Sequence, residues 1–400
     1  MSETGDTAAT TITPAHRNRI ISIDILRGIV MIIMALDHAR DFYSPTIFAP
    51  ENPELTTGFF FFTRWITHYC APVFIFLSGV SAWLYADARG AGKSELARFL
   101  LTRGIWLALL EVFVITFLWQ FGYMFFTMQV IWVIGVSMMI LAGLIFLPRP
   151  LIAVISLAAI AGHNLLDTVT PADAGSLGWL WSFLHVPSFH PTQGGGPIGP
   201  FLVVYPIIPW FAVMALGYVM APLFKTELSV RNRCFLTYGA GAVVLFLALR
   251  GLNIYGNPSP WTEQMRGTFY TFLSYMNVEK YPPSLLYLLM TLGPALLLLP
   301  WLEKWTGKMG AIFATYGKTP FLFYILHILL LHVGSALWFR FVWDTPGVIF
   351  FNPATWPERY EPVLWKAYLA WAIVCLLLYW PCKWFSDYRK THKQWWLSYL

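Results

Sequence analysis

The sequence has few charged residues and few cysteines, and both scarcities exclude classes of protein. Only 12% of the 400 residues are charged and 58% are hydrophobic, whereas soluble domains have about 25% charged residues. The few cysteines lie in or beside apolar runs and form no CxxC pair, which argues against a disulfide framework or a thiolate zinc site. They are Cys70, Cys234, Cys375 and Cys382. An ordinary soluble domain and a disulfide-stabilised secreted domain are therefore excluded, and no metal site is predicted.

Several familiar motifs are also missing. No P-loop, GxGxxG or GxSxG stands between a predicted strand and a helix, so neither a nucleotide-binding turn nor a nucleophile elbow is predicted. Residues 1–18 are polar and lack the apolar segment of a cleavable signal peptide. We expect residues 1–18 to be a disordered cytoplasmic tail and residues 19–400 to form a single transmembrane domain.

Long apolar runs account for most of the chain. A helix needs about 20 largely apolar residues to cross a bilayer, and the 20 Trp and 19 Tyr residues suit belts at the membrane surfaces. The predicted fold is all-α: a polytopic integral membrane protein with about ten transmembrane helices in one bundle. The predicted spans are 20–43, 60–85, 103–119, 123–147, 151–167, 201–224, 233–251, 283–302, 319–342 and 363–384.

The distribution of Lys and Arg predicts the orientation. With the N-terminus in the cytoplasm, every cytoplasmic connection contains Lys or Arg, whereas the long outer loop 168–200 contains neither. This is the pattern of the positive-inside rule. The net charge of +6 is therefore attributed to membrane topology, and no nucleic-acid partner is predicted. The lipid bilayer is the expected partner, and a homodimer is compatible with the sequence.

The first predicted span carries ionisable residues at both ends. Arg27 lies near its cytoplasmic end, and Asp37, His38 and Asp41 lie near its outer end. Each charged group inside the hydrocarbon costs about 2.5–3.5 kcal/mol on insertion scales, so such groups indicate function. The eleven residues from Arg27 to His38 make about three helical turns, so both lie on one face about 16 Å apart. Arg27 and His38 are predicted to contact the same path through the membrane at two different depths.

His38 is the predicted general base, because a neutral imidazole can accept a proton near pH 7. Asp41, one turn further on, or Asp37 would orient the ring. The alternative is a histidine that reaches toward the headgroups at a helix end. His68 precedes Pro72, which should free backbone carbonyls beside a cavity. His68 is interpreted as either a catalytic helper or a structural histidine.

Arg27 has three interpretations. Its guanidinium suits a phosphate or a thioester carbonyl, but it would equally form an ion pair with Asp24 or with Glu111 of the third span. Basic residues on the cytoplasmic side would attract an anionic nucleotide, although membrane topology also requires them there. Those predicted to bind a cofactor together with Arg27 are Arg98, Arg103 and Lys318.

Further polar residues fall at the outer ends of the spans, beside long outer loops of the kind that often carry function. His327 and His332 are five residues apart in the ninth span and do not share a helix face closely, which argues against a metal pair. A second group is predicted to bind substrate, with capping and solvation of helix ends as the alternative. It comprises His163, Asn164, Asp167, Lys280 and Tyr281.

Six segments together resemble the heparan-alpha-glucosaminide N-acetyltransferase-like family of membrane acyltransferases, particularly its bacterial members. The spacing from Arg27 to His38 is also similar to the arginine, ten residues, histidine motif of the sugar O-acyltransferases of bacterial envelopes, which use the pair in acyl transfer. The six segments are SIDILRGIVMIIMALDHARDFY, RWITHYCAPVFIFLSG, FLLTRGIWLALLE, AGHNLLD, YPIIPWFAVMALGY and KYPPSLLYLLMTLGP.

The resemblance implies ten or eleven transmembrane helices in a bacterial inner membrane. It also implies that cytosolic acetyl-CoA donates an acyl group to an acceptor on the outer side. We expect this acceptor to be a hydroxyl or amine of a sugar or glycan, and we expect no metal to take part. In the animal lysosomal enzyme, an asparagine of the first helix and a histidine of the following loop are implicated. The asparagine is similar in position to Asp37. Residues 44–59 contain no histidine, so His38 or His68 would take over that role.

Two other functions compete with acyl transfer. In a transporter or flippase, intramembrane charges would gate a permeant and prolines would break helices near the midplane. The sequence shows no clear inverted repeat, and its polar residues gather toward one face of the membrane, which favours acyl transfer. A scaffold or sensor without turnover is the third interpretation. The prolines in question are Pro72, Pro206, Pro209 and Pro294.

Overall fold

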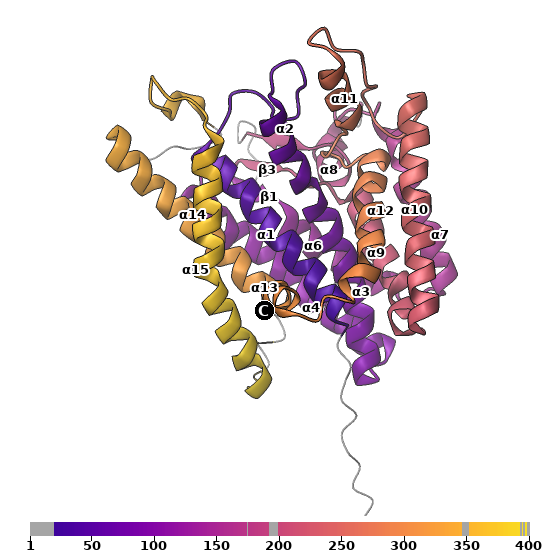
Figure 1. Cartoon of the computed structure of the whole chain (residues 1–400). Coiled ribbons are helices and arrows are strands. Elements are labelled where there is room, and N and C mark those ends of the chain that lie inside the picture. The colour runs from indigo at the N-terminus through magenta and orange to yellow at the C-terminus, as the bar shows by residue number, and fades with distance from the viewer. Residues whose placement is uncertain are drawn as a thin grey trace, which may run out of the picture.

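The computed structural model describes residues 20–173, 175–191, 199–345, 352–392, 394 and 397. Over these residues the chain is a bundle of long helices with a small sheet at one end (Figure 1). The predicted disordered tail, residues 1–18, lies outside the described residues.

Each predicted span contains a helix. Eight of the helical segments in the described residues are long and apolar enough to cross a membrane: Gly58–Arg89, Lys93–Gln120, Arg149–Leu166, Ile207–Lys225, Leu228–Leu252, Leu285–Leu302, Pro320–Trp343 and Leu364–Thr391. The other two spans are α1 (Ile21–Tyr43), which carries more charge, and α6 (Val130–Leu144), which is shorter. An all-α polytopic membrane protein is therefore confirmed.

Several of the eight segments are made of successive helical pieces. Gly58–Arg89 contains α2 (Gly58–Trp65), a 3₁₀ turn over Ile66–Tyr69 and α3 (Cys70–Arg89). Lys93–Gln120 contains α4 (Lys93–Leu110), a π-helical turn over Glu111–Ile115 and α5 (Thr116–Gln120). The remaining segments contain α7 (Arg149–Gly162), α9 (Ile207–Met220), α10 (Leu228–Leu252), α12 (Leu285–Leu302), α14 (Pro320–Trp343) and α15 (Leu364–Thr391).

The sequence did not predict the small sheet or three helices. The strands β1 (Phe126–Met128), β2 (Ser188–His190) and β3 (Phe201–Val203) lie in the order β1-β3-β2, with β1 parallel and β2 antiparallel to β3. Spans 123–147 and 201–224 were therefore predicted to begin too early, because a short apolar run cannot be assigned to strand or helix from its pattern alone. The added helices are α8 (Gly178–Leu184), α11 (Thr268–Met276) and α13 (Lys308–Lys318).

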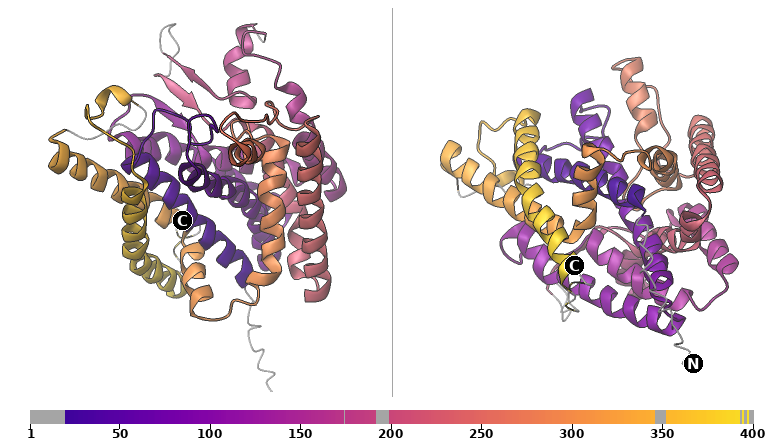
Figure 2. Two further views of the ribbon diagram at one scale, coloured as in Figure 1. Left: turned by 45° about the horizontal axis from the view of Figure 1, so that its top comes forward. Right: turned by 60° about the horizontal axis from the view of Figure 1, so that its bottom comes forward.

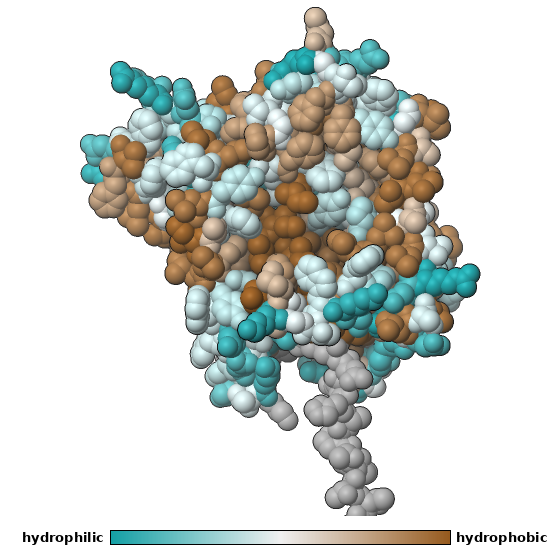
Figure 3. Space-filling view, viewed as in Figure 1, coloured by the Kyte–Doolittle hydropathy of each residue, from teal (hydrophilic) through white to brown (hydrophobic). Residues whose placement is uncertain are grey.

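Helix α1 runs through the middle of the bundle. It packs against α3, α12, α13, α14 and α15, and Figure 2 shows the indigo N-terminal helix between the yellow C-terminal helix and the orange α12. On the face shown in Figure 3, hydrophobic side chains form a band across the molecule and hydrophilic ones gather at its two ends. This is the surface that a bilayer-spanning protein requires.

Two glycines allow α1 and α13 to cross with their backbones in contact. A Cβ atom on Gly28 would lie 1.8 Å from the carbonyl oxygen of Phe313, and one on Gly317 would lie 1.8 Å from the carbonyl oxygen of Asp24. Small residues permit such close packing of membrane helices. This crossing positions Arg27, the residue next to Gly28, against α13.

A methyl group at this crossing should destabilise the bundle. Gly28→Ala is expected to lower the free energy of unfolding by about 1–3 kcal/mol, because the added atom overlaps backbone that cannot rotate away. Gly143→Ala is the matched control, since a Cβ there meets nothing within 4 Å. Thermal unfolding of the purified protein in detergent measures both, and equal effects would contradict the close crossing.

Candidate active site

A cavity of about 520 Å³ lies beside the C-terminal end of α1. Its lining includes five of the predicted site residues: Asp37, His38, Asp41, Lys280 and Tyr281. Each strand of the small sheet also contributes to the wall, through Thr127 of β1, Phe189 of β2 and Leu202 of β3. The sheet therefore closes one side of the cavity into which the predicted general base projects.

His38 is hydrogen bonded to a second histidine, His327 of α14. Its Nδ1 lies 2.7 Å from Nε2 of His327, and Nδ1 of His327 lies 2.9 Å from the carbonyl oxygen of Phe323. The two ring planes are inclined by 15° and their centroids are 5.0 Å apart, as expected for two rings that lie edge to edge and share one hydrogen bond. His327 is fully buried, so this contact fixes the orientation of the His38 ring.

The chain of hydrogen bonds assigns the protons on both neutral rings. The carbonyl of Phe323 can only accept, so Nδ1 of His327 carries a proton and Nε2 of His327 is the acceptor. Nδ1 of His38 must then donate to it. Nε2 of His38 is left unprotonated, and it has no hydrogen-bond partner among the described residues. His38 thus presents the lone pair that a general base needs.

The sequence suggested that Asp41 or Asp37 orients the ring of His38. This is wrong, because the hydrogen bond that holds the ring is made with His327. Asp37 lies between two arginines, 3.1 Å from Arg40 and 2.6 Å from Arg64. Asp41 accepts a hydrogen bond of 2.7 Å from Arg40. The carboxylates therefore hold the two buried guanidinium groups at the cavity wall.

The loop after α1 adds a third carboxylate. Glu51 lies 2.6 Å from Nε of Arg64 and 3.7 Å from Nε2 of His68. Burial opposes the ionisation of Glu51, but the positive charge of Arg64 outweighs it and holds the pKa of Glu51 well below its usual range. The loop that lacks a histidine thus supplies an anion to the same network.

His68 is buried and does not line the large cavity. Its backbone carbonyl has no amide donor four residues on, because that position is Pro72. The hydroxyl of Tyr287 donates to this carbonyl instead, over 2.7 Å. Pro72 therefore leaves this carbonyl without a helical donor, as expected. The expectation that it would open to the cavity is wrong, because a tyrosine of α12 takes it up.

Lys280 and Tyr281, which lie in the segment before α12, bring donors into the cavity. Lys280 is buried, and its ammonium lies 5.0 Å from the centre of the Tyr281 ring. Burial raises the pKa of Tyr281, but the positive charges of Lys280 and Arg64 outweigh this and lower it below its ordinary value. The cavity therefore combines one unprotonated imidazole with several N–H and O–H donors.

Two smaller cavities continue from this one along α1. The first, of about 110 Å³, shares Met34, Phe74, Val130 and Tyr324 with the large cavity. The second, of about 240 Å³, shares Arg27, Ser78, Arg103, Met138 and Pro320 with the first. Cavities that share their lining are neighbours, so the three form a series from the Arg27 region of α1 to His38.

The far end of this series is basic. Arg27, Arg103 and Lys318, all predicted to bind a cofactor, line the 240 Å³ cavity together with Arg389. Arg98, the fourth cation predicted for this role, is exposed on α4 and lines none of the three cavities. The structure brings together three of the four predicted cations and adds one from α15.

The local contacts of Arg27 separate the two ion-pair alternatives for it. Its guanidinium donates to Ser81 over 2.9 Å and to the carbonyl of Gly317 over 3.2 Å, and it lies 3.8 Å from Asp24. Glu111 instead accepts from the first-turn amides of α6, 3.1 and 3.2 Å away. An Arg27–Glu111 ion pair is therefore wrong, whereas the pair with Asp24 is present.

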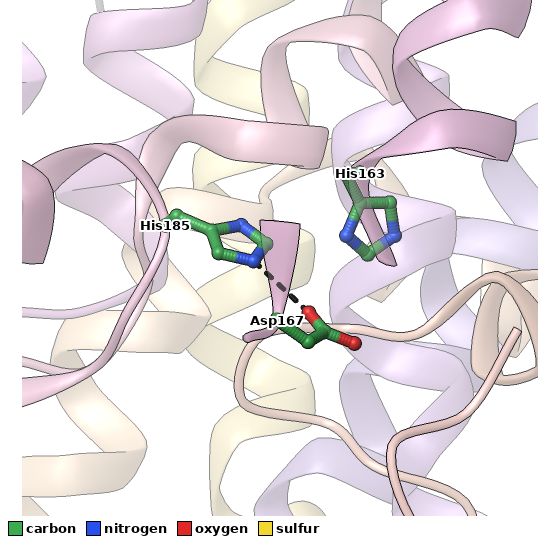
Figure 4. Close-up of side chains that lie close together, drawn as sticks. All are labelled: His163, Asp167 and His185. Carbon is green, nitrogen blue, oxygen red and sulfur yellow. Dashed lines mark hydrogen bonds and ion pairs between the residues drawn. The ribbon is translucent and has the colours of Figure 1, made fainter. Parts of the chain in front are cut away.

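Three of the predicted substrate-binding residues lie elsewhere. His163, Asn164 and Asp167 at the end of α7 do not line the large cavity. His163 and Asp167 instead gather with His185, which follows α8 (Figure 4). Asn164 accepts a hydrogen bond of 2.9 Å from the amide of Leu285, so it joins the ends of α7 and α12.

Removing Asp37 should be costly for stability, because Arg40 and Arg64 would keep buried charges without their shared carboxylate. Asp37→Asn is expected to destabilise the protein by about 3–5 kcal/mol. Asp387→Asn is the control, since Asp387 pairs with Lys390 on the exposed surface of α15. Chemical unfolding in mixed micelles measures the difference, and a neutral effect of Asp37→Asn would contradict the buried network.

Glu51 should give a stability difference that depends on pH. The folded state lowers its pKa, so its contribution is complete above the unfolded value of about 4.3 and is lost as the pH falls through the folded value. Glu51→Gln should therefore lower the Tm at pH 7, and the gap to the unmodified protein should narrow below about pH 4. Glu54→Gln, exposed in the same loop, is the control. A gap that stays constant with pH would show that the charge is not responsible.

Comparison with known proteins gives one family. The family model described as heparan-alpha-glucosaminide N-acetyltransferase, catalytic, matches residues 19–256. A search of curated proteins found no match. The matched residues run from α1 to beyond α10 and include His38, whereas His327 and Lys280 lie outside them. The match covers more than half of the chain, and we conclude that the protein belongs to the heparan-alpha-glucosaminide N-acetyltransferase catalytic family of membrane acyltransferases.

Proposed function

We propose that this protein transfers an acyl group from cytosolic acetyl-CoA to a hydroxyl or amine of a sugar or glycan acceptor on the outer side of a bacterial inner membrane. The observation that carries the proposal is the unprotonated Nε2 of His38 at one end of a series of cavities whose other end is basic. A transferase working across a membrane needs both a donor site and a general base in one connected space.

The residues that line the two smaller cavities suit a coenzyme A thioester, which would supply the activated acyl group. Arg27, Arg103, Lys318 and Arg389 form a cationic lining that matches a diphosphate and a phosphate. The 110 Å³ cavity that follows is narrow and lined mainly by apolar side chains, such as Met31. A narrow apolar passage fits an extended chain such as the pantetheine arm.

The large cavity holds the groups that the transfer requires. Nε2 of His38 takes the proton from the acceptor hydroxyl or amine while the acceptor attacks the thioester carbonyl. The C–S bond then breaks, and the imidazolium of His38 returns the proton to the departing CoA thiolate, so that CoA leaves as the free thiol. The hydrogen bond to His327 keeps the ring in this tautomer and orientation. Lys280 and Tyr281 carry donors that stabilise negative charge on the carbonyl oxygen. Positioned general-base catalysis of this kind typically contributes 10²–10⁴-fold.

The walls of the large cavity suit a sugar. Aromatic side chains line it from several elements, among them Trp119 of α5, Phe189 of β2 and Tyr205 before α9. Aromatic faces pack against the apolar faces of sugar rings, and Asp41 with Lys280 offers partners for ring hydroxyls. The acceptor proposed is therefore a sugar or glycan that enters from the end of the bundle that carries the small sheet.

A transporter or flippase is the second candidate, because three neighbouring cavities along α1 also resemble a permeation path. The two functions separate experimentally. A transferase binds radiolabelled acetyl-CoA in purified form and releases CoA slowly. Substrate counterflow in vesicles without acetyl-CoA binding would favour the transporter.

His38→Ala should lower acyl transfer by at least about 10²-fold, because the general base is removed. The measurement is release of the CoA thiol from acetyl-CoA in membranes supplied with an envelope glycan and lipid extract. The matched control is His332→Asn on the same helix as His327, because His332 bonds the carbonyl of Leu118. Unimpaired transfer by a folded His38→Ala protein would rule out His38 as the base.

Arg103→Gln should weaken acetyl-CoA binding by roughly tenfold to a hundredfold, because a charge-assisted contact is worth about 1.5–3 kcal/mol. Arg98→Gln is the matched control, since Arg98 lies on the same helix but outside the three cavities. Equilibrium binding of labelled acetyl-CoA to purified protein measures both. Equal losses would show that only the overall positive charge of this face matters.

A further inference from the structure

A second cluster of polar side chains lies away from the proposed active site. His163 begins the 3₁₀ turn His163–Leu166 that follows α7, Asp167 comes directly after this turn, and His185 follows α8. One ligand atom from each can be chosen so that all three lie within 4.8 Å of one another (Figure 4). None of the three lines the large cavity, so catalysis as proposed above does not account for them.

Both histidines are buried with nitrogens that lack partners. His163 is 2% exposed and His185 is 0% exposed. Both ring nitrogens of His163 lack a hydrogen-bond partner among the described residues, and so does Nδ1 of His185. Buried polar atoms are normally satisfied, so unpartnered ones require an explanation such as an ion.

The carboxylate of the cluster is already oriented. Oδ1 of Asp167 lies 3.0 Å from Nε2 of His185, and Oδ2 of Asp167 accepts a hydrogen bond of 2.8 Å from Asn164. Asn164 is itself fixed by the amide of Leu285. Asn164 is not one of the three clustered residues, and a hydrogen bond from such an outer residue to a ligand is typical of metal sites.

We propose that His163, Asp167 and His185 bind a Zn²⁺ ion, with water as the fourth ligand. Two imidazoles and one carboxylate are ligands that zinc accepts in tetrahedral sites, with bonds of about 2.0–2.2 Å. Bonds of that length place ligand atoms about 3.4 Å apart, so binding draws the three side chains together by small rotations. The proposal replaces the sequence prediction that the protein has no metal.

The position of the cluster indicates a structural role. The ion would join the end of α7 to the segment after α8, and that segment leads directly into β2. Phe189 of β2 lines the large cavity. Zinc at this site would therefore hold the sheet that walls the proposed active site, independently of whether that site transfers acyl groups.

Metal content of the full chain tests the proposal. The protein is purified in detergent through a tag without histidine, stripped with a chelator, loaded with ZnCl₂, passed through gel filtration and analysed by elemental mass spectrometry. One retained Zn²⁺ per chain is expected for the unmodified protein. His163→Asn, Asp167→Asn and His185→Asn should each lose it, and Zn²⁺ should raise the Tm of the unmodified protein but not of these three variants.

The matched control is His190→Asn. His190 lies in β2 and contacts the hydroxyl of Ser182 over 2.9 Å, so it is a nearby histidine outside the cluster, and this variant should retain the ion. Gel filtration and circular dichroism establish that each variant is folded. If a variant does not fold, Co²⁺ loaded into the unmodified protein provides a second test, since a tetrahedral site gives visible d–d absorption. Absence of retained Zn²⁺ in the unmodified protein, or equal retention by the cluster variants, would overturn the assignment.

Discussion

The structure depends on one constraint: α1 carries ionisable side chains through an apolar bundle, where each of them needs a partner. Asp37 meets this need by lying between Arg40 and Arg64. Leaving either charge unpaired in low dielectric would cost several kcal/mol. Because the carboxylates of this region are committed to arginines, they are not available to His38. The imidazole is therefore held by another helix, through His327 of α14.

Because the carboxylates pair with arginines and His38 pairs with His327, the cavity contains both a charged wall and an unprotonated imidazole nitrogen. Ion pairs among α1, α2 and the loop between them make a charged wall, and the histidine pair presents a lone pair beside it. Further along the same helix, Gly28 lets α13 approach and brings Lys318 near Arg27 at the basic end of the cavity series. One helix thus organises both ends of the proposed reaction path.

Much of this was predictable from the sequence, because the signals are local. The long apolar runs predicted the helices, and the eleven-residue spacing on one helix predicted that Arg27 and His38 face one path. The structure adds partners that are distant in the chain. His327 is 289 residues from His38, and no periodicity connects them. Glu51 lies in an irregular loop, and the short strands β1 and β3 could not be told from helix ends by their pattern. The one signal in the sequence that could have marked His327 as a site residue is its position as a histidine in the middle of an apolar span.

The central claim is that a donor entering at the basic end of the cavity series reaches His38. The most direct measurement is a cryo-electron microscopy structure of the full chain in lipid nanodiscs with a non-hydrolysable acyl-CoA analogue. The account predicts the phosphates beside Arg103 and Lys318 and the acyl end in the cavity lined by His38. Binding at the end that carries the small sheet, or an acyl group that lies outside that cavity, would contradict it.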